Sequence, residues 1–160
     1  MTGRGDRGAN KWLATGGVLS ALAALLHIAI VIGGPDWYRF FGAGEGMARA
    51  AEQGSPMPAI VAGAIALILF IWACYAFSGA GLLRRLPLLR TGLVAISAIY
   101  LLRGLALVPA LLFRPELVDP FAIWSSLIVL GYGLAYAIGT WAAWPRLHPV
   151  WTAPGSATNP

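Results

Sequence analysis

The chain has 160 residues, of which 59% are hydrophobic and 11% are charged, and its mean hydropathy is +0.74. A soluble domain carries about a quarter charged residues, so this composition excludes a soluble globular protein and indicates a one-domain integral membrane protein. The net charge is +5, and the basic residues flank apolar stretches. That arrangement predicts contact with a lipid bilayer and not with nucleic acid.

Four apolar stretches predict four transmembrane helices, at about residues 12–32, 59–77, 93–113 and 121–144. Each is close to the roughly 20 residues that cross a bilayer as a helix. The first stretch is longer than the roughly 7–15 apolar residues of a secretory signal, so we expect it to remain as the first span. Asp119 followed by Pro120 predicts an N-cap and the first helical residue of the fourth span.

The distribution of Lys and Arg predicts the orientation. Seven of these residues lie in the two terminal segments and the second connection, and three lie in the first and third connections. Because basic residues favour the cytoplasmic side, we expect both termini inside and the first and third connections outside. Residues 1–11 are then a disordered cytoplasmic tail and residues 145–160 a second cytoplasmic tail.

The first connection, residues 33–58, is too long for a tight helical hairpin. Its middle is aromatic (WYRFFGAGE, residues 37–45), and residues 47–53 predict a short amphipathic helix with Arg49 and Glu52 on its polar side. Two interpretations stay open: an interfacial anchor lying on the outer surface, or a lid over an outward-facing cavity.

Small residues recur at four-residue intervals in two of the spans and predict close helix packing. The two sets are Gly16, Ser20 and Ala24 in the first span, and Gly131, Ala135 and Gly139 in the fourth. The predicted fold is therefore an all-α four-helix transmembrane bundle with both termini cytoplasmic and a long outward first loop that contains a short interfacial segment.

Arg103 is the one charged residue within residues 93–113. A charge at the centre of a membrane helix costs roughly 2.5–3.5 kcal/mol on insertion scales, so something must offset it. A rise of about 1.5 Å per residue places Arg103 and His27 at a similar depth in the outer half of the membrane. Ser125 and Ser126 enter the same layer from the outside, and Tyr100 lies one turn before Arg103.

Three roles for Arg103 stay open. Its guanidinium reaches the outer interface, or it pairs with an acid of an outer loop, or it lines a polar pocket for an anionic or polar ligand. Glu45 is the first choice of partner because the flanking Gly44 and Gly46 let the backbone bend closely. For His27 the alternatives are a neutral imidazole bonded to the backbone or a serine, and a ligand or proton-relay role. The candidate ligand-binding residues are His27, Arg103, Glu45, Tyr100, Ser125 and Ser126.

Several chemistries lack a signature in the sequence. No His, Cys or carboxylate cluster has metal-ligand spacing, and Cys74 has no cysteine partner in the chain. A haem with two axial histidines is not expected, because His148 lies in the C-terminal tail and only His27 is at membrane depth. We therefore expect no cofactor and no bound metal.

Residues 37–45 (WYRFFGAGE), 78–81 (SGAG), 86–90 (LPLLR) and 100–104 (YLLRG) resemble a family of small, uncharacterised bacterial four-span inner-membrane proteins. The resemblance covers most of residues 12–144. It implies a location in the inner, cytoplasmic membrane of a Gram-negative cell and brings no activity.

The sequence favours a non-enzymatic membrane protein with an outer-leaflet site for a small polar or lipid-like ligand. The first alternative is an accessory or scaffold subunit that packs against a membrane-protein partner or a second copy of itself. The second is a membrane enzyme that uses His27 as an acid or base, which is weaker because no carboxylate or nucleophile lies beside it within a span.

Overall fold

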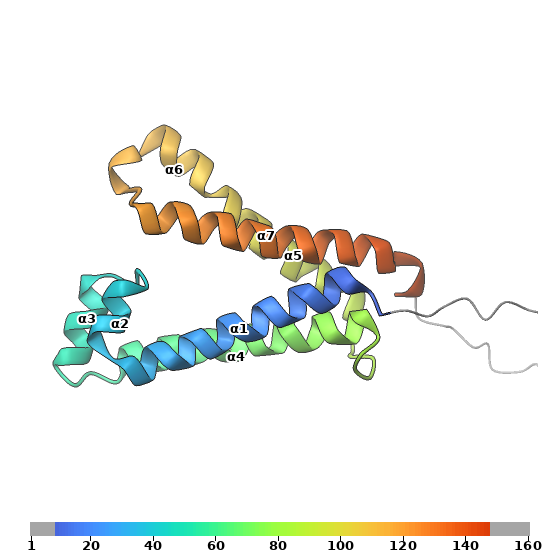
Figure 1. Ribbon diagram of the computed structural model, residues 1–160, viewed down its shortest axis with the longest axis horizontal. Helices are drawn as coiled ribbons and strands as arrows, with labels where there is room; N and C mark the ends of the chain where they lie inside the picture. The colour runs from blue at the N-terminus through green and yellow to red at the C-terminus, as the bar shows by residue number, and fades with distance from the viewer. Residues whose placement is uncertain (1–8, 148–160) are drawn as a thin grey trace, which may run out of the picture.

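The computed structural model describes residues 9–147, and in that range it contains helices and no strand. Four helical segments are long and apolar enough to cross a membrane (Figure 1). They are α1 (Lys11–Gly33), α4 (Met57–Ala80), the pair α5 (Leu89–Leu105) and α6 (Leu107–Phe113), and α7 (Pro120–Ala143). The prediction of an all-α four-helix bundle is confirmed, and the chain is a multi-pass membrane protein. The predicted tails fall largely outside the described residues.

Shorter helices fill the connections. The first connection contains α2 (Pro35–Phe40) and α3 (Glu45–Glu52), the third contains a 3-10 turn η1 (Pro115–Leu117), and α7 runs into a second turn η2 (Trp144–Arg146). The predicted amphipathic helix at residues 47–53 is thus present as α3, with Arg49 and Glu52 exposed in ion pairs and Ala48 fully buried. The helix α2 was not predicted from the aromatic run.

The four spans form two pairs. α1 packs along α4, and α5 packs along α7. The pairs meet near the end where the described chain begins and ends, and they diverge toward the end that holds α2 and α3 (Figure 1). The helix pairs are therefore in contact at the end near the termini of the described chain and apart at the other end. The helices α2 and α3 lie at that open end, and we call them together the cap.

Asn10 and Leu13 close the terminal end. The Asn10 side-chain oxygen accepts a hydrogen bond from the Leu13 N–H at 3.2 Å and caps α1, while its Nδ2 donates to the Gly139 carbonyl of α7 at 2.7 Å. Leu13 is fully buried between two glycines, and a Cβ on Gly79 or Gly139 would lie within 2.9 Å of its side chain. The glycines are what bring α1 close to α4 and α7 here.

The small-residue prediction is right for α1 and partly wrong for α7. Gly16, Ser20 and Ala24 are buried along α1, and Ala135 and Gly139 are buried in α7. Gly131 instead faces open space, with no atom within 4 Å of a Cβ built on it. The four-residue spacing missed Gly133, which lies against Leu101 of α5.

The third span is broken where the sequence predicts one continuous helix. α5 ends at Leu105 and α6 begins at Leu107, with Ala106 between them. Pro109 explains the break, because it has no N–H to donate to the Leu105 carbonyl and its ring crowds that carbonyl. Arg103 therefore lies in the last turn of α5, directly before the break.

Candidate functional site

A cavity of about 580 Å³ lies between the two helix pairs on the side of the cap. Four of the six candidate residues line it, namely His27, Tyr100, Arg103 and Ser125. Most of the remaining wall is apolar and comes from α1, α4 and α7. Its volume falls within the roughly 300–1,000 Å³ typical of small-molecule sites, and an apolar wall with few polar groups is typical of them too.

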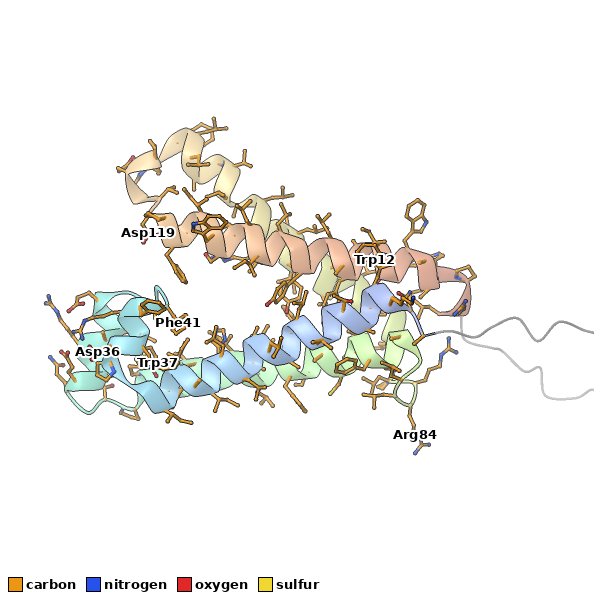
Figure 2. The ribbon with its side chains drawn as sticks, in the orientation of Figure 1. Trp12, Asp36, Trp37, Phe41, Arg84 and Asp119 are labelled. Carbon is orange, nitrogen blue, oxygen red and sulfur yellow. The ribbon has the colours of Figure 1, made fainter. Side chains whose placement is uncertain are left out.

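The cap forms part of the wall of the cavity. Tyr38 and Ala48 pack with Ile30 of α1 and Ala62 of α4 in one buried cluster, so the cap is attached to the α1–α4 pair. Tyr38, Phe41 and Met47 face the cavity. Figure 2 shows Phe41 on the cap opposite the start of α7, where Asp119 lies. Across this gap the Phe121 ring lies against the Gly42 backbone, where a side chain would collide with the ring.

Ion pairs join charged side chains on the exposed surface of the cap. Arg39 bonds Asp36, Glu45 and Glu52, at 3.3, 2.9 and 2.7 Å, and Arg49 bonds Glu45 at 3.0 Å. Hydrogen bonds from Arg39 and then Arg49 lower the pKa of Glu45 from 4.5 to about 2. The hydrogen bonds that Arg39 donates to the Glu45 and Glu52 carboxylates likewise raise the pKa of Arg39. The predicted pair between Glu45 and Arg103 is therefore wrong, because the Glu45 carboxylate is held by two nearer arginines.

Arg103 binds a serine in place of an acid. Its Nη1 donates to the Ser126 Oγ of α7 at 3.2 Å, and Ser126 is buried. The five acids within residues 9–147 all have other partners: three bond Arg39, Glu116 bonds Arg114, and Asp119 caps the Ala122 N–H. The guanidinium charge thus reaches the cavity without a carboxylate partner among the described residues, since a hydroxyl supplies a dipole and no compensating charge.

His27 is oriented by its own helix. Its Nδ1 lies 2.8 Å from the Ala23 carbonyl, and a carbonyl can only accept, so Nδ1 carries a proton. In the neutral ring Nε2 is then an acceptor, and the residue borders the cavity. The described acids are engaged elsewhere, so His27 has no acid partner for proton transfer. This matches the backbone-bonded alternative.

A chain of hydrogen bonds crosses all four helices beside the cavity. The Tyr136 hydroxyl of α7 donates to the Trp72 carbonyl of α4 at 3.1 Å. Ser20 of α1 must then donate to Tyr136, 2.8 Å away, and Tyr100 of α5 must donate to Ser20, 2.9 Å away. Each of these hydroxyl protons is used once, so the chain runs in one direction from Tyr100 to Trp72.

The sequence interpretation named Tyr100 but missed the other aromatic residues of this group, Trp72, Tyr132 and Tyr136. Tyr132 lines the cavity beside Tyr100, with ring centroids 5.6 Å apart and near-perpendicular planes. The Trp72 and Tyr100 rings meet edge to face at 4.9 Å. The available signal for the missed tyrosines was their position, at residues 132 and 136 inside the fourth predicted span. Ser125, which was predicted, borders the cavity and donates to the Ala122 carbonyl at 3.2 Å.

The cavity brings a cationic side chain together with hydrogen-bonding groups in apolar surroundings. It combines one arginine, one histidine and several hydroxyls with apolar walls, and among the described residues no hydrogen bond joins a hydroxyl to His27. Within residues 9–147, no group of three His, Cys, Asp or Glu side chains is placed to hold a metal ion.

A scan of protein-family models, a search of curated proteins and a search of solved structures each found no match to this chain.

Proposed function

We propose that this multi-pass membrane protein binds an amphiphilic molecule in the cavity between its helix pairs, with an anionic head group at Arg103 and an apolar tail against α1 and α4. The observation that carries the proposal is an arginine that lines an apolar cavity and has a serine, but no carboxylate within residues 9–147, as its partner. An anion would supply the missing charge, and a guanidinium binds carboxylate or phosphate oxygens through two parallel N–H groups.

Other features of the cavity support an amphiphile over a small ion. Ile30, Val61 and Leu69 contribute apolar wall that a lone ion would leave in contact with water. The hydroxyl of Tyr132 can donate a hydrogen bond to an anionic head group, whereas Nε2 of His27 can only accept one, from an O–H that the head group carries. The cavity also favours binding over a scaffold role, for which a filled core is the expected structure.

The test measures binding to the full chain in a neutral detergent by titration calorimetry. The probes are decanoate, decyl phosphate and decyltrimethylammonium, which share a chain length and differ in charge. We expect saturable binding of one or both anions and none of the cation. Arg103→Gln should weaken anion binding at least tenfold, because the head group loses its oppositely charged partner. Arg103→Lys keeps the charge and should retain binding within about threefold.

Arg114→Gln is the matched control. Arg114 is exposed and pairs with Glu116, so its loss changes the net charge equally without touching the cavity. Binding should stay within twofold of the parent. Equal losses in the two glutamine variants, or equal binding of the cationic probe, would overturn the proposal and leave Arg103 as a side chain that reaches the interface.

We also propose the predicted setting: the inner membrane of a Gram-negative bacterium, both termini cytoplasmic, and membership of the four-span family that the sequence resembles. The support is the excess of Lys and Arg in the terminal segments and second connection. Reporter fusions within α3 and within residues 82–88 test the orientation. A cytoplasmic α3 would refute it.

A further inference from the structure

A second hollow, of about 490 Å³, lies between α5 and α7 on the half of the molecule nearer the described chain ends. Its small lining residues are Ser97, Ala98, Ala137 and Thr140, and the larger side chains of Leu101 and Trp141 border it. We call this hollow the α5–α7 groove. Trp141 is 80% exposed, so the groove opens on the surface that faces lipid. Its lining is mostly apolar and suits a hydrocarbon chain.

One end of the groove carries a positive charge. The Arg90 guanidinium lies over the Trp144 ring, with its carbon 3.6 Å from the ring centroid, and Trp144 lines the groove. Arg90 is one helical turn before Val94, another lining residue, so both lie on the same face of α5. Stacking uses the flat face of the guanidinium and leaves its in-plane N–H groups to bind an anion.

The charges of this end of the molecule favour an anionic partner. Arg84, Arg85, Arg90 and Arg146 lie here, and Arg85 donates a hydrogen bond to the Arg146 carbonyl. The acids within residues 9–147 lie in the first and third connections at the opposite end. Figure 2 shows this separation, with Arg84 at one end and Asp36 and Asp119 at the other.

Thr140 adds a polar group to the groove, about one helical turn farther from Arg90 than Trp144 is. It is 4% exposed, and its Oγ1 is the one buried side-chain polar atom without a hydrogen-bond partner among the described residues. It lies one turn from Trp144, about 6 Å along α7. An acyl ester oxygen of a glycerophospholipid lies a comparable distance below its phosphate, so the hydroxyl is at the level where such an oxygen would accept its proton.

We propose that the α5–α7 groove binds an anionic glycerophospholipid, with the phosphate at Arg90 and one acyl chain along Ala98 and Ala137. The phosphate pairs with the in-plane N–H groups of the stacked guanidinium. The indoles of Trp141 and Trp144 flank the glycerol region, where tryptophan is enriched in membrane proteins. This site is separate from the cavity at Arg103 and does not depend on what that cavity binds.

Native mass spectrometry of the full chain in detergent tests the proposal. The protein is titrated with phosphatidylglycerol and phosphatidylcholine of identical acyl chains. We expect the first phosphatidylglycerol to bind at least fivefold more tightly than phosphatidylcholine. Arg90→Ala should lower phosphatidylglycerol affinity about fivefold, to the level of phosphatidylcholine.

Two further variants separate the groove from general surface charge. Arg84→Ala removes the same charge at the same end of the molecule, but Figure 2 shows Arg84 directed away from the bundle, so affinity should stay within twofold. Ala98→Phe keeps every charge and fills the groove, so it should lower phosphatidylglycerol affinity as much as Arg90→Ala. Both changes lie on exposed positions, and circular dichroism should show unchanged helicity.

The contrary results are distinct. Equal losses in Arg90→Ala and Arg84→Ala would mean diffuse attraction and overturn the site. If Ala98→Phe left the affinity for phosphatidylglycerol unchanged, the acyl chain would not lie in the groove. Competition by soluble glycerol phosphate at the concentration of the lipid would show that free phosphate is the ligand. A protein dimer that Ala98→Phe dissociates would assign the groove to a second copy. Each of these results refutes the proposal.

Discussion

Ser20 is the central member of the hydrogen-bond chain that joins the two helix pairs, because it bonds both Tyr100 and Tyr136. The substitution Ser20→Ala therefore gives a quantitative test of that chain. The substitution deletes the bonds of Ser20 to Tyr100 and to Tyr136, at 2.9 and 2.8 Å. Ser20 is fully buried, so water cannot replace them. Tyr100 loses its acceptor, and Tyr136 keeps its own bond to the Trp72 carbonyl.

The magnitude follows from the two lost bonds. Interhelical hydrogen bonds in membrane proteins contribute about 0.6 kcal/mol on average and at most about 1.7 kcal/mol. The loss of two such bonds should lower the free energy of unfolding by about 1–3 kcal/mol. The loss is near the upper value if the Tyr100 hydroxyl finds no other acceptor. The direction of the chain also sets an order: Tyr100→Phe removes one donor, leaves Ser20 bonded to Tyr136, and should cost less than Ser20→Ala.

The assay is reversible unfolding of the full chain in mixed micelles of a neutral detergent and sodium dodecyl sulfate, followed by circular dichroism. Ser97→Ala is the matched control, because Ser97 is also buried but bonds only the Leu93 carbonyl of its own helix, at 2.7 Å. Its cost should be about 0.5 kcal/mol or less. If Ser20→Ala costs no more than Ser97→Ala, or less than Tyr100→Phe, the assigned chain is refuted.

Two further predictions concern packing and pH. Gly139→Val should destabilise the protein by about 1–3 kcal/mol in the same unfolding assay, because a Cβ there meets the Leu13 backbone nitrogen at 2.8 Å, whereas Gly131→Val, in open space, should be close to neutral; equal effects would refute the packing. The lowered pKa of Glu45, about 2 against 4.5, means that its ion pairs stabilise the cap fully above pH about 4.5 and are lost as the pH falls toward about 2. The protection of the α2 and α3 amides, measured as exchange relative to the intrinsic rate at each pH, should fall through this range, and Glu45→Gln should show lower protection near pH 7 with little further fall on acidification; an unchanged protection profile in that variant would contradict the assignment.

The sequence predicts the helical elements of this protein well because their signals are local. Apolar runs of about 20 residues are enough to identify the four spans, and the Asp119–Pro120 pair correctly marks the start of α7, where the Asp119 carboxylate accepts the Ala122 N–H at 2.6 Å. The break between α5 and α6 is also a local effect, and Pro109 was the available signal. A rise of about 1.5 Å per helical residue predicts a similar depth for Arg103, His27 and Ser125, and these three residues do line one cavity.

Only the tertiary structure shows which way each side chain faces, because the position of a residue along its helix does not give this direction. Lipid and neighbouring helices are both apolar, so a membrane helix carries little periodic signal for its buried face, and Gly131 and Gly133 could not be told apart by spacing. Charge pairing depends on the same information. Glu45 was the first choice of partner for Arg103, but the fold of the cap places it between Arg39 and Arg49, and Arg103 bonds Ser126 instead. The cavity exists because the two helix pairs diverge away from the glycine contacts at Leu13, and that divergence is a property of the packed molecule.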